Sequence, residues 1–120
     1  MTTNRTPTEY QEMRILAAYL NYRKLKWCHP VNEGKRSPVT GRILKSLGLK
    51  AGVPDILIFN KPNRMVMDPV GMAIELKRQK GSKPTDMQNQ WMDDLAGEGW
   101  LTRVCYGATE AIRFVEEYYA

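Results

Sequence analysis

Apolar residues recur at the spacing of one helix face in four segments of the chain. We expect these helices from Thr8 to about Leu25, from Arg42 to Leu47, after Thr85 and after Thr109. Thr8 and Thr85 are suited to capping a helix N-terminus, and Gln88 follows Thr85 at the spacing of a capping box. Gly48 is placed to close the short second helix.

Shorter apolar runs between these helices predict strands. They lie at Trp27–His29, Ile56–Phe59, Gly71–Leu76 and Trp100–Tyr106, with Met65–Met67 as a short extension. Ile56–Phe59 is continuously apolar, which predicts a central strand covered on both faces. The order α-β-(α)-β-β-α-β-α is typical of an α/β fold with a small mixed sheet flanked by helices.

Two acidic residues and a lysine interrupt the two central apolar runs. Asp55 follows Gly52-Val53-Pro54 at the entry of one strand, and Glu75 and Lys77 lie two residues apart in the next. Alternate residues of a strand point to the same side, so Glu75 and Lys77 share a face. Two carboxylates and an ammonium at one edge of a sheet predict a divalent-metal site with a general base or charge stabiliser beside it.

Each of these residues also has a purely structural interpretation. Pro54-Asp55 is ordinary turn chemistry at a strand entry. Glu75 and Lys77 could form an ion pair on an edge strand. Against that interpretation, Glu75 interrupts an apolar run, where a carboxylate is costly to bury unless it is paired or bound to a metal.

A hydrolytic nuclease site would use these residues as follows. Mg²⁺ or Mn²⁺ held by Asp55, Glu75 and the backbone carbonyl of Leu76 would activate water and neutralise phosphate oxygens. Lys77 would either orient or deprotonate the water, or stabilise the transition state as a cation. The sequence does not separate these roles.

Three further polar residues are open to two interpretations. Gln88 either completes the capping box or holds the attacking water with its side-chain amide. Glu9 and Glu12 are either surface acids that the helix dipole favours or the source of a third metal carboxylate.

The charge balance points to a polyanionic partner. The chain carries 18 Lys and Arg against 13 Asp and Glu, a net charge of +5. The loops that flank the acidic motif are basic, which indicates a surface that contacts DNA phosphates. The residues concerned are Lys35, Arg36, Arg42, Lys45, Lys50, Arg78, Lys80 and Lys83.

Membrane and secretory signals are absent from the pattern. No apolar run approaches the roughly 20 residues of a membrane span, and the polar N-terminus lacks the apolar core of a signal peptide. We therefore expect an intracellular protein, in bacterial or, if phage-encoded, host-cell cytoplasm, with Cys28 and Cys105 as free thiols.

Taken together, Gly52-Val53-Pro54-Asp55, Glu75-Leu76-Lys77 and Gln88 resemble the PD-(D/E)XK nuclease superfamily. The resemblance is close to its virus-type replication-repair nuclease branch, the VRR-NUC domain. Similarity also extends to the helix start Thr8–Glu12, the loop His29–Gly34 and the closing segment Gly107–Tyr118. One departure is Met13, where many members have a glutamine four residues after the first acid, which leaves Glu9 and Glu12 as alternatives.

The resemblance implies a restriction-endonuclease-like core in one domain, residues 8–120, after a flexible start at 1–7. It implies an Mg²⁺- or Mn²⁺-dependent DNA endonuclease with Asp55, Glu75, Lys77 and Gln88 catalytic. Its metal ligands would be Asp55, Glu75, the Leu76 carbonyl and Glu9 (or Glu12). Stand-alone phage members are similar to structure-specific nucleases that dimerise, so branched DNA and a homodimer are expected.

Two non-catalytic alternatives stay open. Arg42–Leu49 would suit the first half of a DNA-binding helix-turn-helix, yet a proline and a β-prone run follow where the recognition helix belongs. The same fold could also serve as an inactive scaffold, against which the intact set of Asp55, Glu75 and Lys77 argues.

Overall fold

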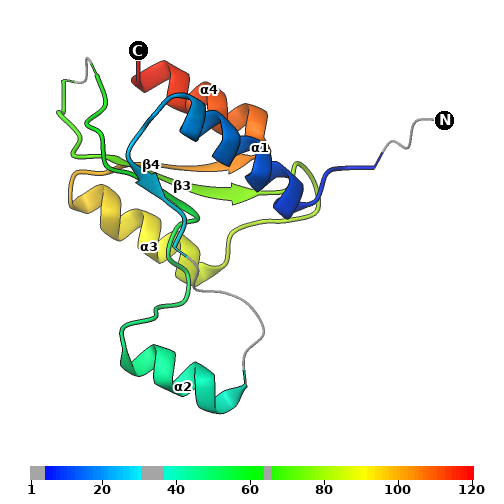
Figure 1. The fold of residues 1–120 in the computed structure, drawn as a ribbon. Helices are drawn as coiled ribbons and strands as arrows, with labels where there is room; N and C mark the ends of the chain where they lie inside the picture. The colour runs from blue at the N-terminus through cyan, green and yellow to red at the C-terminus, as the bar shows by residue number, and fades with distance from the viewer. Residues whose placement is uncertain (1–4, 31–36, 64–65) are drawn as a thin grey trace.

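In the part of the chain that the structure describes, residues 5–30, 37–63 and 66–120, a four-stranded mixed sheet lies at the centre of an α/β fold (Figure 1). The structure is a computed structural model. β1 (Trp27–Cys28), β2 (Ile56–Ile58) and β3 (Met72–Lys77) pair antiparallel, and β4 (Leu101–Tyr106) pairs parallel to β3. The helices are α1 (Glu9–Tyr22), α2 (Pro38–Ser46), α3 (Asp86–Gly97) and α4 (Ala108–Tyr118). This order confirms the predicted one.

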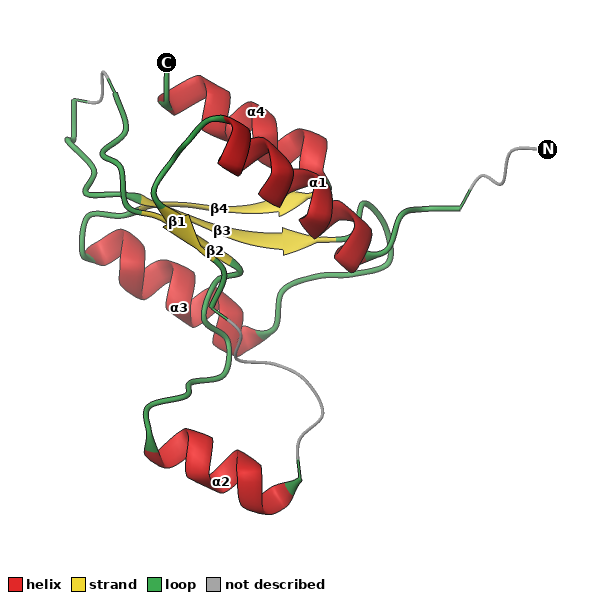
Figure 2. Cartoon of the chain, viewed as in Figure 1, coloured by secondary structure: helices red, strands yellow, loops and turns green. Residues whose placement is uncertain are grey.

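The sheet separates two layers of helices (Figure 2). α1 and α4 cover one face and α3 covers the other, while α2 stands apart from the sheet. The main hydrophobic core lies on the first face, where Leu16 and Leu20 of α1 and Phe114 of α4 meet buried strand residues. Those strand residues are Ile56, Ile58, Met72, Ile74 and Leu76.

The alternation of side chains along β3 shows which face of the sheet its other residues occupy. Because Met72, Ile74 and Leu76 face α1 and α4, Ala73, Glu75 and Lys77 face the α3 side. All six residues of β3 are buried, since helices cover the strand on both faces.

Two helix starts confirm the predicted capping boxes. Thr8 Oγ1 accepts from the Gln11 N–H at 3.1 Å, and Gln11 Oε1 accepts from the Thr8 N–H at 2.8 Å. Thr85 and Gln88 make the same reciprocal pair at the start of α3. Each pair satisfies N–H groups that the first helical turn leaves without backbone partners.

Three predicted boundaries were wrong. α1 ends at Tyr22 rather than near Leu25, because Lys24 adopts a φ of 57°, which a right-handed helix does not continue through. α2 begins at Pro38 rather than after Thr40, because the Ser37 hydroxyl caps it. α4 begins at Ala108, with Gly107 rather than Thr109 at the N-cap.

Two predictions about strands need correction. β3 lies between β2 and β4, so the edge-strand interpretation of Glu75 and Lys77 was wrong. Val66 and Met67 lie in a turn and do not extend a strand, and Met65 falls outside the described residues. β2 is central as predicted, although it ends at Ile58.

The segment between α2 and β2 holds a turn and the strand entry, with no second helix over residues 47–55. The helix-turn-helix alternative therefore lacks its recognition helix. None of the helices in the described ranges combines the length and apolar character that crossing a bilayer requires.

The two cysteines differ in their surroundings. Cys28 is exposed on β1, whereas Cys105 is buried in β4. Burial, with the nearby Glu110 adding to it, raises the pKa of the Cys105 thiol to about 12. Cys105 is therefore a protonated, unreactive thiol at neutral pH.

We predict that a thiol reagent such as Ellman's reagent, applied near pH 8, titrates Cys28 in the native protein and Cys105 only after unfolding. The reason is that Cys105 is both inaccessible and protonated. Absorbance at the end of each reaction counts the thiols. Cys28→Ser should remove the native reaction, and fast labelling of both thiols in the folded wild type would contradict the prediction.

Candidate active site

The register of the central strands brings Asp55 and Glu75 together. Ile56 pairs with Ile74 across the antiparallel ladder, so its continuation by one position sets Asp55 opposite Glu75. Directly opposed residues of antiparallel strands point to the same side of the sheet. The two carboxylates therefore share the face toward α3, near the C-terminal end of β3.

Hydrogen bonds hold Asp55 from two directions. Its carboxylate Oδ2 accepts from the backbone N–H of Leu76 at 2.8 Å, between Glu75 and Lys77. The ring nitrogen Nδ1 of His29 lies 2.5 Å from the backbone oxygen of Asp55, so this nitrogen donates to the carbonyl. Asp55 is thus tied to β3 by its side chain and to the end of β1 by its backbone.

The loop that precedes Asp55 is docked on α3. Gly52 has a φ of 87°, and a Cβ there would lie 3.0 Å from the backbone carbon and oxygen of Met87. Glycine is required at this position both by the left-handed backbone and by the close approach. Trp91 Nε1 donates to the carbonyl of Ala51 at 3.0 Å, which adds a second attachment.

Glu75 and Lys77 place two charges in an otherwise apolar strand. Glu75 is 1% exposed and Lys77 is 7% exposed. Their closest atoms, Glu75 Oε2 and Lys77 Nζ, are 3.9 Å apart. This is an ion pair at a separation too long for a direct hydrogen bond.

The carbonyl of Leu76 is oriented toward the same site. The N–H of Gly107 donates to the Lys77 carbonyl at 2.8 Å, so the Lys77 carbonyl points toward the β4 side. Successive carbonyls of a strand point in opposite directions, and the Leu76 N–H points to Asp55. The Leu76 carbonyl therefore points to the Asp55 side.

This donor set suits a hard divalent cation. Carboxylate oxygens of Asp55 and Glu75 and the carbonyl of Leu76 are the ligand type that Mg²⁺ and Mn²⁺ prefer. Over the ranges 5–30, 37–63 and 66–120, no three side chains of His, Cys, Asp or Glu form a group able to hold an ion. The register places Asp55 and Glu75 on one face, and a third carboxylate from Glu9 or Glu12 stays a prediction.

The two acids of α1 lie in different surroundings. Glu12 is 3% exposed, and its Oε2 accepts from Gln79 Nε2 at 3.0 Å. Its Oε1 accepts from the N–H of Ala108 at 3.3 Å, at the start of α4. Glu9 is half-buried in the same helical turn. α1 lies on the opposite face of the sheet from the Asp55–Glu75 pair, and Glu12 joins α1, α4 and the loop after β3.

Gln88 lies on the correct side of the sheet. It is buried on α3, the helix that covers the face of Glu75 and Lys77. Its Oε1 accepts from the Thr85 N–H at 2.8 Å, so the structural interpretation is confirmed. A catalytic role would have to use its amide nitrogen as a donor.

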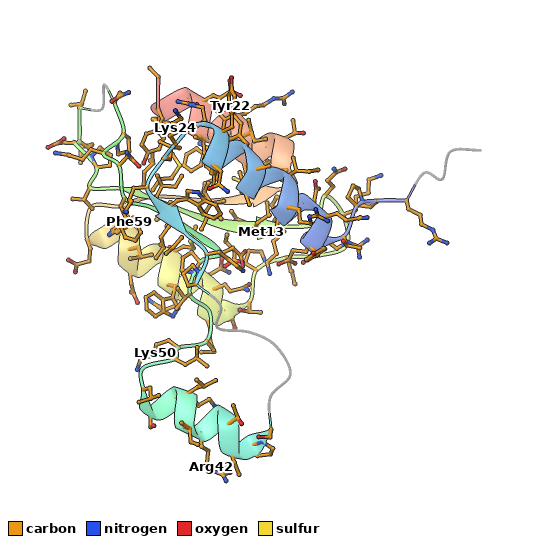
Figure 3. The ribbon with its side chains drawn as sticks, in the orientation of Figure 1. Met13, Tyr22, Lys24, Arg42, Lys50 and Phe59 are labelled. Atoms are coloured by element: carbon orange, nitrogen blue, oxygen red, sulfur yellow. The ribbon has the colours of Figure 1, made fainter. Side chains whose placement is uncertain are left out.

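The predicted basic residues fall in two described groups. Arg42 and Lys45 lie on α2 and Lys50 on the segment after it, where Figure 3 shows Arg42 pointing away from the sheet. Arg78, Lys80 and Lys83 are exposed on the loop between β3 and α3. Lys35 and Arg36 lie outside the described residues.

Two residues that position the acids were not foreseen in these roles. His29 binds the Asp55 backbone from 26 residues away, and Gln79 binds Glu12 from 67 residues away. No local spacing connects either pair. The sequence offered one indication for each residue. His29 begins the loop after β1, and Gln79 follows the Glu75-Leu76-Lys77 motif by two positions.

Comparisons with known proteins identify a family and a related fold. The sequence model of the VRR-NUC domain family matches residues 7–109. A solved structure described as a VRR_NUC domain protein superposes with a TM-score of 0.75 at 25% sequence identity. That alignment covers 95% of this chain and 89% of the other. No curated protein matches the chain significantly.

We predict that Glu12→Ala lowers the free energy of unfolding by about 1–3 kcal/mol, because the buried N–H of Ala108 loses its acceptor. Urea denaturation measures this difference. The matched control is Glu117→Ala on the exposed side of α4, which should change stability little. Equal stability of the two variants would show that the Glu12 hydrogen bonds do not support the junction of α1 and α4.

Proposed function

The chain belongs to the VRR-NUC domain family of nucleases, and we propose that it is a metal-dependent endonuclease that hydrolyses phosphodiester bonds in DNA. The observation that carries the proposal is the pairing of Asp55 with Glu75 on one face of the sheet, beside the buried Lys77. Carboxylates in this arrangement are costly for folding and suited to metal-assisted hydrolysis.

The ion would be Mg²⁺ or Mn²⁺, held by Asp55, Glu75 and the carbonyl of Leu76. When bound, such an ion lowers the pKa of a bound water and neutralises charge on phosphate oxygens. The protein's own contribution is to fix the donors. Asp55 is held by the Leu76 N–H, and Glu75 by its place in a strand covered on both faces.

Lys77 has two chemically distinct uses in this site. As an ammonium it stabilises the charge that develops on the phosphate, and as a neutral amine it accepts a proton from the attacking water. Gln88 would orient that water or a metal-bound group through its amide nitrogen. Lys77 is buried in β3 on the face that α3 covers, and Gln88 is buried on α3.

We propose branched or otherwise structured DNA as the substrate. Arg78, Lys80 and Lys83 follow the catalytic strand directly, and Arg42 and Lys45 lie on α2, which stands away from the sheet. Basic groups on two separated elements suit contacts to more than one duplex arm.

A homodimer is the proposed functional state. None of the α2 residues is buried, although Val39, Ile43 and Leu47 lie on one side of this helix. Lys45 lies on the opposite side, and Arg42 lies at the border of the apolar side, three positions after Val39. An apolar helix face exposed in the monomer is a suitable contact for a second copy, and it leaves the basic face available to DNA.

We predict metal-dependent cleavage that falls about a hundredfold or more in Asp55→Ala and in Lys77→Ala. Labelled linear duplex, flap and four-way-junction DNA are incubated with Mg²⁺, Mn²⁺ or EDTA and resolved on gels. Lys77→Arg distinguishes the two roles of Lys77, since arginine keeps the positive charge but cannot act as a base. It should keep part of the activity if Lys77 acts as a cation.

The matched control is Lys61→Ala, whose side chain is exposed and pairs with Asp68 at 3.0 Å in the loop after β2. It should cleave like the wild type. Mg²⁺ should also raise the melting temperature of the wild type more than that of Glu75→Gln, because an ion that binds the folded state stabilises it. Binding of DNA without cleavage under every metal condition would favour the non-catalytic binding module.

We predict that the protein is a dimer by light scattering and that Ile43→Glu makes it monomeric. The substitution introduces a charge in the apolar face of α2. Lys45→Glu on the opposite side of the same helix is the control. A monomeric wild type at high protein concentration, with and without junction DNA, would contradict the proposed dimer.

A further inference from the structure

The solvent side of α1 carries no acidic side chain. Its exposed residues occupy one continuous arc of the helix. They are Tyr10, Gln11, Arg14, Ile15, Ala18, Asn21 and Tyr22, here called the α1 outer face. The two acids of this helix, Glu9 and Glu12, lie outside this arc. An exposed helix face normally carries charged residues of both signs, so this composition is unusual.

Two tyrosines mark the ends of the α1 outer face. Tyr10 is 70% exposed and Tyr22 is 80% exposed. The helical rise separates them by about 18 Å along α1. The guanidinium carbon of Arg14 lies 6.0 Å from the ring centroid of Tyr10, so a cation stands beside the first ring. Flat rings in water next to a cation are suited to stacking with other planar groups.

A groove runs along the same helix. It has a volume of about 820 Å³ and lies between the chain at residues 5–8 and α1. Arg5 and Arg14 both line it, together with the apolar side chains of Ile15 and Ala18, and no carboxylate contributes to the lining. The groove therefore combines two guanidinium groups with an apolar floor.

Helices α3 and α4 carry acidic residues on their exposed sides. The exposed residues of α3 include Asp86, Asp93 and Asp94, and those of α4 include Glu110, Glu116 and Glu117. A polyanion would be repelled from these two surfaces and not from the α1 outer face. The N-terminal end of α1 also lies at the C-terminal edge of the sheet, where Glu12 binds Ala108. The α1 outer face thus begins at the edge of the sheet that holds Glu75 and Lys77.

We propose that the α1 outer face and its groove bind single-stranded nucleic acid. Unpaired bases would stack on Tyr10 and Tyr22, and Arg5 and Arg14 would contact the phosphates between them. Duplex DNA conceals its base faces, so the tyrosines would contribute little to binding it. The inference rests on the proposed function in one respect: the strand held here would be the unpaired arm of a branched substrate.

Binding is measured as the fluorescence anisotropy of a labelled 15-nucleotide oligothymidylate in EDTA, where no cleavage occurs. We expect wild-type binding that weakens with added salt, and a loss of about tenfold or more in Tyr10→Ala/Tyr22→Ala. Tyr10→Phe/Tyr22→Phe should bind like the wild type, because the rings are retained. Affinity for a 15-base-pair duplex should be the same in all three proteins.

Two exposed residues elsewhere supply the matched controls. Met67→Ala removes an exposed apolar side chain in the turn after β2, and Arg113→Ala removes an exposed arginine on α4. Both should bind the oligonucleotide like the wild type, whereas Arg14→Ala should weaken it severalfold. Thermal melting of each variant verifies the fold.

The proposal is overturned if the wild type does not bind the oligonucleotide, if the double alanine variant binds it unchanged, or if that variant loses duplex and single-strand affinity equally. If the double alanine variant loses the dimer but binds the oligonucleotide unchanged, the α1 outer face serves self-association. That result also overturns the proposal. A chain that binds the strand but never cleaves DNA overturns the nuclease and leaves this proposal standing. A chain that cleaves DNA but does not bind the single-stranded oligonucleotide overturns this proposal and leaves the nuclease standing.

Discussion

The hydrogen bond between the Leu76 N–H and the Asp55 carboxylate is the contact on which the site depends. The backbone ladder between β2 and β3 ends at the pair Ile56 and Ile74, and the side chain of Asp55 supplies the next acceptor at 2.8 Å. A carboxylate therefore continues the sheet where a backbone carbonyl would otherwise do so. This bond ties Asp55 to β3 one position beyond the backbone ladder, at the N–H between the two charged residues of β3.

The burial of Glu75 and Lys77 is explained by their place next to the hydrogen bond between Asp55 and Leu76. An interior strand covered by helices on both sides is a poor place for two charges, because desolvation costs more than a pair 3.9 Å apart returns. A core built for stability alone would place apolar residues there. Retention of the charges, at the strand end where the Asp55 bond holds a second carboxylate, is the pattern expected of a functional site.

Local chemistry explains what the sequence could predict. Both capping boxes depend on residues three positions apart, and the pairing of Asp55 with Glu75 follows from an antiparallel hairpin across one connecting loop. Contacts at long range escaped prediction: Glu12 meets Ala108 across 96 positions, and nothing in the pattern of α1 distinguishes its role from that of Glu9. The start of α4 was missed for a related reason. Gly107 adopts a φ of 95° against Gln79 and Glu12, so tertiary packing rather than a side-chain cap sets that boundary.

Exposed charge differs from helix to helix in this fold. The acids that face solvent on helices lie on α3 and α4, while the exposed residues of α1 and α2 include none. A net charge of +5 by itself would indicate only a weak preference for polyanions. Its segregation is more informative, because the acidic surfaces of α3 and α4 would repel a nucleic acid whereas those of α1 and α2 would not. The N-terminal end of α1 lies at the edge of the sheet that holds Glu75 and Lys77. Glu12 is compatible with this asymmetry although it is acidic. Its carboxylate is buried and accepts from two N–H donors, so it adds no negative charge to the exposed surface of α1.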